Sequence, residues 1–375
     1  MLSKPKVIFF HPYFSDGGVE RTNIYLARGL IAKGYKVAFV TIMPTLTFLP
    51  EVRSLGIEWV VLPAKSTFTA QPAFLRWIRN QQSVEHQLVV ISCQYYVNLI
   101  CLMFRPLWGS RVFHILSERN HLNEFKVHRS FKYSLIERLV RFFYSFADMV
   151  IANSKELASD LSNATGCPVD VVYNPTINDR LYRLAEESIT EEWFHDENRP
   201  IVLAVGRLSP QKDFATLILA FSMLQKVHNG RLIILGEGTE REKLETKAKD
   251  LGISGDLLMP GFVLNPYKFM KKASLFVLSS VYEGLPNVLI EAVALKVPVV
   301  STACRSGPTE ILLRGKVGQL VPVGDAEALA EAMSNALKNP KEVQLMVRSA
   351  GESLSRFEPE SAVESLVALF QGKHL

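Results

Sequence analysis

The chain has 375 residues, 48% hydrophobic and 21% charged, which is enough for two domains with full cores and excludes the composition of a disordered protein. Its four cysteines form no C-x-x-C pair, so neither a zinc site nor a disulfide framework is predicted. The net charge of +5 is concentrated in residues 1–178, which hold 19 Lys plus Arg against 12 Asp plus Glu, and no motif typical of nucleic-acid-binding proteins accompanies it.

The first half alternates short apolar runs with stretches of helical spacing. Residues 1–6 lack the apolar core of a signal peptide, so export is not expected. Residues 87–104 are uncharged but contain polar positions, which favours a buried strand followed by a helix over a membrane span. The alternation predicts right-handed βαβ units and a parallel sheet covered on both faces. The strand candidates are residues 7–10, 36–41, 59–62, 88–91, 112–115, 149–152 and 169–173.

The loop of residues 11–19 leads into a helical pattern at residues 20–33 and carries the pair Gly17-Gly18. Glycine at the start of a helix lets the backbone approach a phosphate closely and presents amide donors to it. The dinucleotide fingerprint G-x-G-x-x-G and the P-loop motif G-x-x-x-x-G-K-[ST] are absent from the sequence. A Rossmann dehydrogenase or a P-loop ATPase is therefore not predicted.

Four polar residues, Ser117 to Asn120, directly follow the strand candidate at residues 112–115. Active sites of open α/β sheets lie at the carboxyl ends of strands, so Glu118, Arg119 and Asn120 are candidates for contact with a substrate. A solvated surface loop is the alternative. His114 falls inside the strand, where a core position is predicted.

Residues 126–146 have the pattern of a basic amphipathic helix, because five Lys and Arg residues alternate with aromatic and aliphatic ones. Such a helix can lie on an anionic membrane surface. It can equally be an ordinary domain helix whose apolar face packs into the core. The sequence leaves both interpretations open.

A boundary between two domains is predicted near residue 178. Residues 171–177 end a strand in Asn-Pro, and residues 180–199 are polar and acidic without a strand pattern. The predicted parts are domains at residues 1–178 and 179–356 and a C-terminal helix at residues 357–375. Pockets favour domain interfaces, so we expect the substrate site between the two domains.

The second half opens with a strand at residues 201–205 and a turn at residues 206–212. Arg207 and Lys212 lie five positions apart in this turn, a spacing that lets both cations converge on one anion near a helix N-terminus. The next strand ends in a glycine-rich turn that contains Gly236 and Gly238. Close passage of a nucleotide and simple turn geometry explain these two glycines equally well.

Two carboxylates flank a strand, loop and helix pattern at residues 275–295. Glu283 follows the apolar strand 275–278, and Glu291 falls in the second turn of the helix. Pro286 suits the first helical position, where its missing N–H costs nothing. Both glutamates can therefore face one elongated ligand, but the spacing alone equally fits an exposed loop acid and a solvated helix acid, which is the commoner arrangement.

The segment EGLPNVLIEA followed by PVVSTACRSGPTEIL resembles the E-x7-E segment of the retaining family 4 glycosyltransferases, which have the two-domain GT-B fold. The resemblance runs from Gly206 to about Asp325, with thinner support at Gly17, Gly18 and residues 117–120. Many relatives have a histidine in the latter loop, where this chain has Ser and Glu. Under the resemblance, Glu118, Arg119 and Asn120 are candidates for contact with the acceptor. The resemblance implies an α/β protein of GT-B architecture: two Rossmann-like, doubly wound parallel-sheet domains, with the last helix crossing back to the first domain.

The resemblance also implies roles for individual residues. Arg207 and Lys212 would bind the donor diphosphate, and Glu283 would hold hydroxyls of the transferred sugar; these three are the predicted catalytic residues. Glu291 would hold the ribose hydroxyls. The other donor contacts implied are Gly17, Gly18, Gly206, Gly236, Gly238, Phe262, Val263, Gly284, Leu285, Asn287 and Val288.

The function implied is retaining transfer of a hexose or N-acetylhexosamine from a nucleotide diphosphate sugar, with UDP favoured, to a glycan or lipid-linked glycan in surface-polysaccharide assembly. No metal or other cofactor is expected, since the sequence has no D-x-D pair and no His/Cys cluster. A cytoplasmic location is expected, with peripheral contact at the inner face of the cell membrane left open. The alternatives are a GT-B-fold UDP-sugar epimerase and a non-catalytic nucleotide-sugar-binding protein.

Overall fold

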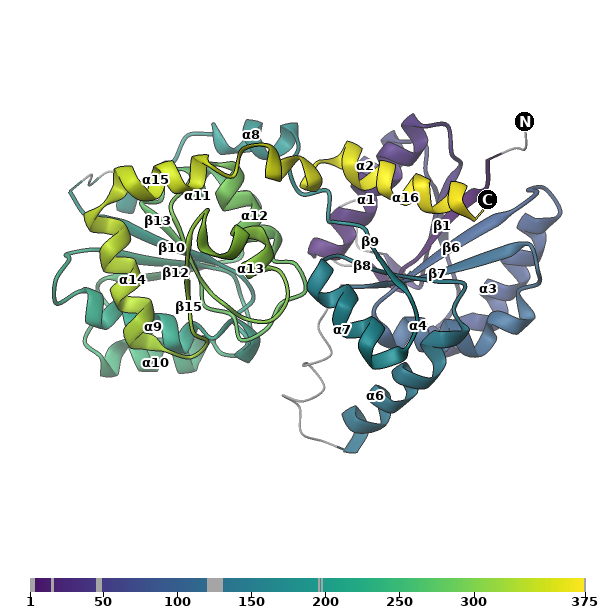
Figure 1. Ribbon diagram of the computed structural model, residues 1–375, viewed down its shortest axis with the longest axis horizontal. Coiled ribbons are helices and arrows are strands. Elements are labelled where there is room, and N and C mark those ends of the chain that lie inside the picture. The colour runs from purple at the N-terminus through teal and green to yellow at the C-terminus, as the bar shows by residue number, and fades with distance from the viewer. Residues whose placement is uncertain are drawn as a thin grey trace. The chain divides into compact units, whose positions relative to one another are not determined.

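The computed structural model describes residues 4–14, 17–44, 49–119, 131–194, 196 and 198–373. The chain forms two compact units, one of Met1–Pro175 with Arg356–Leu375 and one of Thr176–Ser355. We call these unit 1 and unit 2 and describe each by itself. Both contain a parallel sheet with helices packed against it (Figure 1).

Unit 1 has a seven-stranded sheet in the order β5-β3-β1-β6-β7-β8-β9. Every neighbouring pair is parallel, and the central strands are buried along their whole length, which explains their continuous apolar sequences. All seven strands predicted for this half are present. They are β1 (Lys6–Phe10), β3 (Val37–Thr41), β5 (Glu58–Val61), β6 (Leu88–Cys93), β7 (Val112–Glu118), β8 (Met149–Ala152) and β9 (Val169–Val171). Two short strands, β2 (Tyr13–Phe14) and β4 (Met43–Pro44), pair separately.

The helices of unit 1 cover the two faces of this sheet (Figure 1). They are α1 (Gly18–Ala32), α2 (Leu49–Ser54), α3 (Thr67–Gln82), α4 (Tyr95–Phe104), α6 (Phe131–Phe143) and α7 (Lys155–Thr165), with the 3-10 turns η1 (Arg105–Leu107) and η2 (Tyr144–Phe146). The charge-free segment at residues 87–104 is divided between β6 and α4, as predicted. In the described part of the chain, no helix has both the length and the apolar composition needed to cross a bilayer.

The last helix, α16 (Pro359–Gly372), belongs to unit 1 although it follows unit 2 in the sequence. It packs beside α1 so closely that a Cβ at Gly29 would lie 2.4 Å from Val363 Cγ2. The Phe370 ring meets the Tyr35 ring edge-on. The predicted return of the final helix to the first domain is therefore confirmed.

Unit 2 has a six-stranded parallel sheet in the order β12-β11-β10-β13-β14-β15. The strands are β10 (Ile201–Val205), β11 (Arg231–Leu235), β12 (Leu257–Gly261), β13 (Leu275–Leu278), β14 (Val299–Thr302) and β15 (Gln319–Val321). The helices and 3-10 turns are α8 (Asp179–Ala185), η3 (Glu192–Phe194), η4 (Pro210–Lys212), α9 (Phe214–Leu224), α10 (Arg241–Asp250), α11 (Tyr267–Lys272), α12 (Asn287–Ala294), α13 (Pro308–Ile311), η5 (Leu313–Gly315), α14 (Ala326–Lys338), α15 (Pro340–Arg348) and η6 (Gly351–Phe357), the last ending in unit 1. The order reverses beside β10, so the loops after β10 and β13 meet at a switch point of the sheet, where ligands of such folds bind.

Candidate active site

An ion pair joins the loops that follow β10 and β13. Lys212 Nζ lies 2.5 Å from Glu283 Oε1, and the two side chains are only 16% and 8% exposed. Ser280 Oγ donates a hydrogen bond to the same carboxylate oxygen at 2.6 Å. These contacts offset the desolvation of both charges. The structure thus brings together two of the three predicted catalytic residues.

The loop after β10 is fixed by bonds at its end. Asp213 has a φ of +44° and caps α9, accepting from the Thr216 amide at 3.2 Å and from its hydroxyl at 2.7 Å. The Lys212 carbonyl accepts from Ser279 Oγ at 2.7 Å. The side chain of Lys212 is therefore held toward the end of β13 by local capping and by a bond across the two loops.

Arg207 lies on the same loop, but its side chain is exposed. Across the residues that the structure describes, it makes neither a hydrogen bond nor an ion pair, in contrast to Lys212. The predicted convergence of both cations on one anion is not preformed here, and it stays a prediction. A bound diphosphate could draw the flexible guanidinium toward it.

Glu291 is buried on α12 at 8% exposure and accepts a hydrogen bond from Tyr267 Oη, 3.1 Å from Oε1. Tyr267 is the first residue of α11, and its amide donates to Asn265 Oδ1 at 3.1 Å. Asn265 Nδ2 in turn donates to the Leu184 carbonyl at 2.8 Å. Glu291 is thus oriented by a chain of contacts that begins on the loop before α11.

Pro286 differs slightly from its predicted place, because it is the N-cap of α12 and the helix begins at Asn287. Its ψ of 99° is extended, and its carbonyl accepts from the Leu289 amide at 3.0 Å. The proline ring also packs against Gly307, where a Cβ would lie 2.5 Å from Pro286 Cδ. This tertiary contact accompanies the one-residue shift of the helix start.

Gly236 and Gly238 are required by backbone packing within unit 2. A Cβ at Gly236, whose φ is +148°, would lie 1.9 Å from the Gly206 carbonyl oxygen. A Cβ at Gly238 would lie 2.2 Å from the Leu208 carbonyl oxygen. The loops after β10 and β11 are therefore pressed together, which explains the glycines without a ligand. Their contact with a nucleotide, like that of Gly206, stays a prediction.

The other residues of unit 2 assigned to the donor lie on the loops after β12 and β13 or in the first turn of α12. Phe262 follows β12 with 56% of its surface exposed, and Val263 is half-buried. Asn287 accepts a hydrogen bond from Thr176 Oγ1 at 3.2 Å. Between Glu283 and the second turn of α12, the predicted contacts Gly284 and Leu285 are buried, while Asn287 and Val288 are half-buried.

In unit 1, Gly17 is the N-cap of α1 and Gly18 its first residue. Glu20, in the first turn, is buried and lies 3.3 Å from Nε2 of the buried His11. Burial alone would lower the pKa of His11, but hydrogen bonds to Cys93 and Glu20 raise it to about 9. Glu20 therefore stabilises the charged form of His11, in addition to its place in the first turn of α1.

Arg119 and Cys93 join this buried group. Arg119 donates to Asn174 Oδ1 at 2.6 Å and to Asn23 Oδ1 at 3.5 Å, and Asn23 Nδ2 lies 3.6 Å from Cys93 Sγ. Burial would raise the pKa of Cys93, but its bond to His11 and the charge of Arg119 lower it. No local sequence pattern predicts this cluster, because its members lie far apart along the chain.

Glu118 points into a second buried network. Asn98 Nδ2 donates to Glu118 Oε1 at 2.6 Å, and Tyr144 Oη donates to the same oxygen. Asn98 also accepts from Ser92 Oγ, which lies 2.8 Å from His114 Nε2. Fully buried His114 is a core residue, as predicted, and burial followed by the charge of Arg105 lowers its pKa to about 3.

The acceptor contacts predicted at residues 118–120 stay predictions. Glu118 and Arg119 are buried and already bonded, so neither lies on a solvated loop. Asn120 lies outside the described residues. In the described ranges, no three His, Cys, Asp or Glu side chains gather as a metal-ligand set, and the metal independence of the reaction stays a prediction.

Comparison with known proteins decides the family. Two family models match, Glycosyltransferase Family 4 at residues 16–180 and Glycosyl transferases group 1 at residues 185–353. A Campylobacter jejuni protein, the N-acetylgalactosamine-N,N'-diacetylbacillosaminyl-diphospho-undecaprenol 4-alpha-N-acetylgalactosaminyltransferase, is 30% identical over 261 residues, covering 69% of this chain and 68% of that protein. The chain belongs to glycosyltransferase family 4.

Further relatives of this family 4 chain span its whole length. The lipopolysaccharide core biosynthesis glycosyltransferase LpsE of Rhizobium meliloti is 26% identical and covers 98% of this chain and 99% of its own. The crystal structure of Anabaena HepE in complex with UDP superposes with a TM-score of 0.79 at 18% identity, covering 98% of this chain and 100% of HepE. The predicted family, glycosyltransferase activity and GT-B fold are confirmed.

Proposed function

We propose that this glycosyltransferase moves a hexose or N-acetylhexosamine from a UDP-sugar to a glycan or lipid-linked glycan, with retention of the anomeric configuration and without a metal. The observation that carries the proposal is the Lys212–Glu283 ion pair in the loops beside the switch point of unit 2. A cation and a hydrogen-bond acceptor beside this switch point support binding of a sugar diphosphate there.

The chemistry requires charge stabilisation at both ends of the breaking bond. When the bond between the anomeric carbon and the phosphate oxygen breaks, UDP keeps the electron pair and the sugar becomes oxocarbenium-like. Lys212 and Arg207 would stabilise the negative leaving group. The acceptor oxygen then bonds to the anomeric carbon on the face that UDP leaves, and its proton passes to the departing phosphate. Glu283 would hold sugar hydroxyls and orient the ring.

Glu291 and Tyr267 support the choice of a nucleotide donor. A buried carboxylate on α12 that is already oriented by a phenol can accept hydrogen bonds from a ribose diol. UDP is favoured over other nucleotides because HepE, which shares this fold, was crystallised with UDP. Phe262, with its large exposed surface after β12, is available to contact a base.

The acceptor class is proposed from the relatives. One is named for an undecaprenol-linked diphosphate substrate and another for lipopolysaccharide core biosynthesis. We infer a surface-polysaccharide or lipid-linked oligosaccharide acceptor, with the enzyme peripheral to the inner face of the cell membrane.

The test is product analysis with a panel of radiolabelled sugar nucleotides and a membrane extract as acceptor source. Transfer of label from one UDP-sugar into a glycan with unchanged anomeric configuration supports the proposal. Conversion of the UDP-sugar without any acceptor identifies an epimerase instead. Binding of UDP in a thermal-shift assay without turnover of any donor identifies a non-catalytic protein.

A further inference from the structure

Helix α6 of unit 1 has two apolar faces, and only one of them is used by the core. Its inner face packs with α4 and with residues of the sheet. The inner side chains are Ile136, Leu139, Val140 and Phe143. An ordinary domain helix would have polar residues on the remaining surface.

The outer surface of α6 and of the turn η2 that follows it also carries exposed apolar side chains. Leu135 is 46% exposed, and Phe142 and Phe146 are each 63% exposed. The rings of Phe142 and Phe146 meet edge-on with centroids 5.5 Å apart, so they form one aromatic pair at the surface. Positions 135, 138 and 142 follow one side of α6, and Phe146 continues this side in the turn η2 through its contact with Phe142. We call Leu135, Arg138, Phe142 and Phe146 the outer stripe.

The outer stripe lies in a positively charged setting. Arg138 is exposed within the stripe, and Arg141 beside it pairs with Glu137 at 2.8 Å while staying half exposed. Glu137 is the only acidic residue among residues 126–146, against five Lys and Arg. Residues 126–130 lie outside the described part and are not included in the stripe. A surface of aromatic rings between arginines is complementary to anionic headgroups.

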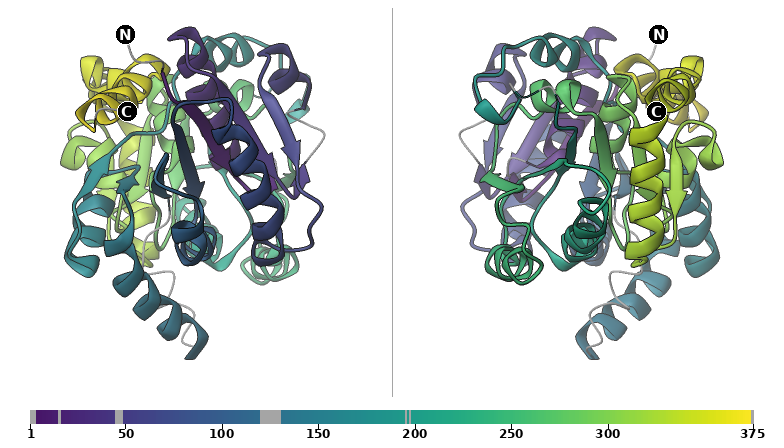
Figure 2. Two further views of the ribbon diagram at one scale, coloured as in Figure 1. Left: turned by 90° about the vertical axis from the view of Figure 1, so that its right-hand side faces the viewer. Right: turned by 90° about the vertical axis from the view of Figure 1, so that its left-hand side faces the viewer.

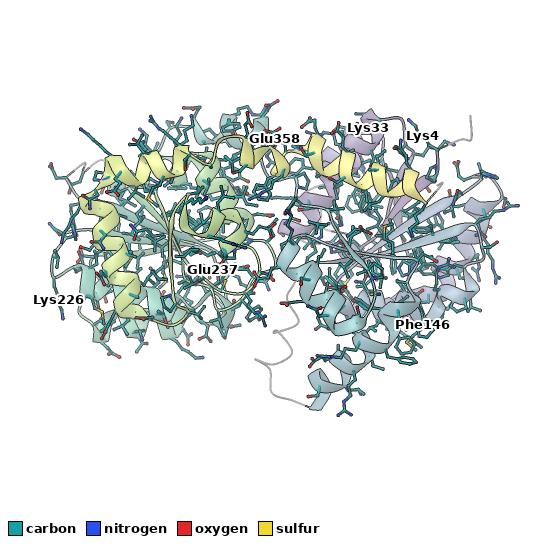
Figure 3. The ribbon with its side chains drawn as sticks, in the orientation of Figure 1. Lys4, Lys33, Phe146, Lys226, Glu237 and Glu358 are labelled. Carbon is teal, nitrogen blue, oxygen red and sulfur yellow. The ribbon has the colours of Figure 1, made fainter. Side chains whose placement is uncertain are left out.

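The fold makes this helix accessible. In Figures 1 and 2, α6 extends beyond the sheet and the other helices of its own unit. Phe146, labelled in Figure 3, follows it directly in η2. A protruding helix can rest on a flat surface without displacing the rest of the unit. A ligand pocket or groove would not require such a protrusion.

We propose that the outer stripe of α6 docks the protein on an anionic lipid bilayer. The stripe inserts its two phenylalanines and Leu135 at the boundary between headgroups and acyl chains, and Arg138 and Arg141 bind lipid phosphates. A second copy of the chain fits less well for two reasons. Pairing two stripes would place their arginines against each other, and a stable interface uses roughly 20 residues on each side, more than the stripe offers. This inference rests on the proposed function for its purpose, which is access to a lipid-linked acceptor.

The test is flotation of the full chain with phosphatidylcholine vesicles and with vesicles that also contain phosphatidylglycerol. We expect binding only to the anionic vesicles, weakened by salt. Each of F142S and F146S should reduce the partition coefficient about tenfold, and R138Q by about fivefold. The matched controls are L345S and R348Q on α15, where Leu345 is 66% exposed and Arg348 is also exposed. The controls should bind like the unchanged chain.

Equal binding of the stripe variants and the unchanged chain would overturn the proposal. So would lipid-free dimers that the stripe variants abolish, since these would make a second copy the occupant. R138Q keeps the test decisive if the serine variants fail to fold. A thermal shift with UDP in the absence of lipid reports separately on unit 2. Vesicle binding without a UDP shift contradicts the proposed function, and a UDP shift without vesicle binding contradicts only the docking.

Discussion

Lys212 and Glu283 form a largely buried ion pair, Nζ to Oε1 at 2.5 Å, although 71 residues separate them in the sequence. Among the described residues, each side chain is the main charged partner of the other, because the second hydrogen-bond donor to Glu283 Oε1, Ser280, contributes only a hydroxyl. Substitution of one residue therefore leaves the other charge poorly compensated.

For this pair, Glu283→Gln should lower kcat about 100-fold with a small change in the donor KM, because it removes charge from the reacting sugar but keeps an acceptor for Ser280. Lys212→Met should lower kcat/KM by a similar factor. Steady-state kinetics of both variants and of the double variant measure the coupling. Additive losses would show that the two residues act independently and would contradict the pairing as a functional unit.

Tyr267 Oη donates a 3.1 Å hydrogen bond to Glu291 and so helps to position it. Tyr267→Phe should raise the donor KM about 5- to 10-fold with little change in kcat, because a hydrogen bond to a charged group contributes about 1–1.5 kcal/mol. Glu291→Ala should raise the donor KM more than Tyr267→Phe does. In the double variant, Tyr267→Phe should cause no increase beyond that of Glu291→Ala. An equal effect of Tyr267→Phe in both backgrounds would mean that the phenol acts elsewhere.

Gly236 is predicted to be indispensable for the stability of unit 2. Gly236→Ala would set a Cβ 1.9 Å from the Gly206 carbonyl oxygen and should destabilise the protein by about 3 kcal/mol. Gly252→Ala is the matched control, because Gly252 also has a positive φ, +71°, but no atom within 4 Å of the new Cβ, so it should cost about 1 kcal/mol. Urea unfolding measures both; equal costs would show that the backbone conformation, not the contact, matters.

His114 should make the protein less stable in acid. Its pKa is lowered to about 3 in the folded state, against about 6.5 when unfolded, so the unfolded chain binds more protons between these values. Stability is unaffected by this group above pH of about 6.5 and falls by about 1.4 kcal/mol per pH unit below it. Between neutral pH and pH of about 5, the free energy of unfolding should therefore fall by about 2 kcal/mol less in the His114→Gln variant than in the unchanged chain.

Urea titrations of the intact chain at several pH values test the prediction for His114. An identical pH dependence of the two proteins would show that His114 is not responsible for the acid sensitivity. The Gln variant keeps a group able to bond Ser92 Oγ, now 2.8 Å from His114 Nε2, so the loss of a core contact is limited.

The strands were predictable because each is a short, continuous apolar run, which a strand buried on both faces requires. The run at residues 88–91 became β6, and the segment after it became α4. The glutamates of the E-x7-E segment were assigned from the family resemblance, and the strand, loop and helix pattern around them placed both at one end of the sheet. Pro286 is the N-cap and not the first helical residue, and its contact with Gly307 is not visible in local sequence.

Contacts between distant residues were not predictable. The cluster of His11, Glu20, Cys93 and Arg119 forms because the carboxyl ends of β1, β6 and β7 are neighbours in a sheet whose order differs from the sequence. The same applies to Tyr267 and Glu291. For α6, the sequence left a membrane face and a core face as alternatives, and the structure has both an inner and an outer apolar side.

The amino-acid sequence by itself determined the family, the two parallel sheets and the loops that carry the chemistry, because apolar periodicity and short motifs act over a few residues. Tertiary structure alone decided that Lys212 pairs with Glu283, that Arg207 stays exposed, and that Phe142 and Phe146 face outward. The physical reason is that partners, burial and exposure depend on which segments the strand order brings together, and no local pattern encodes that order.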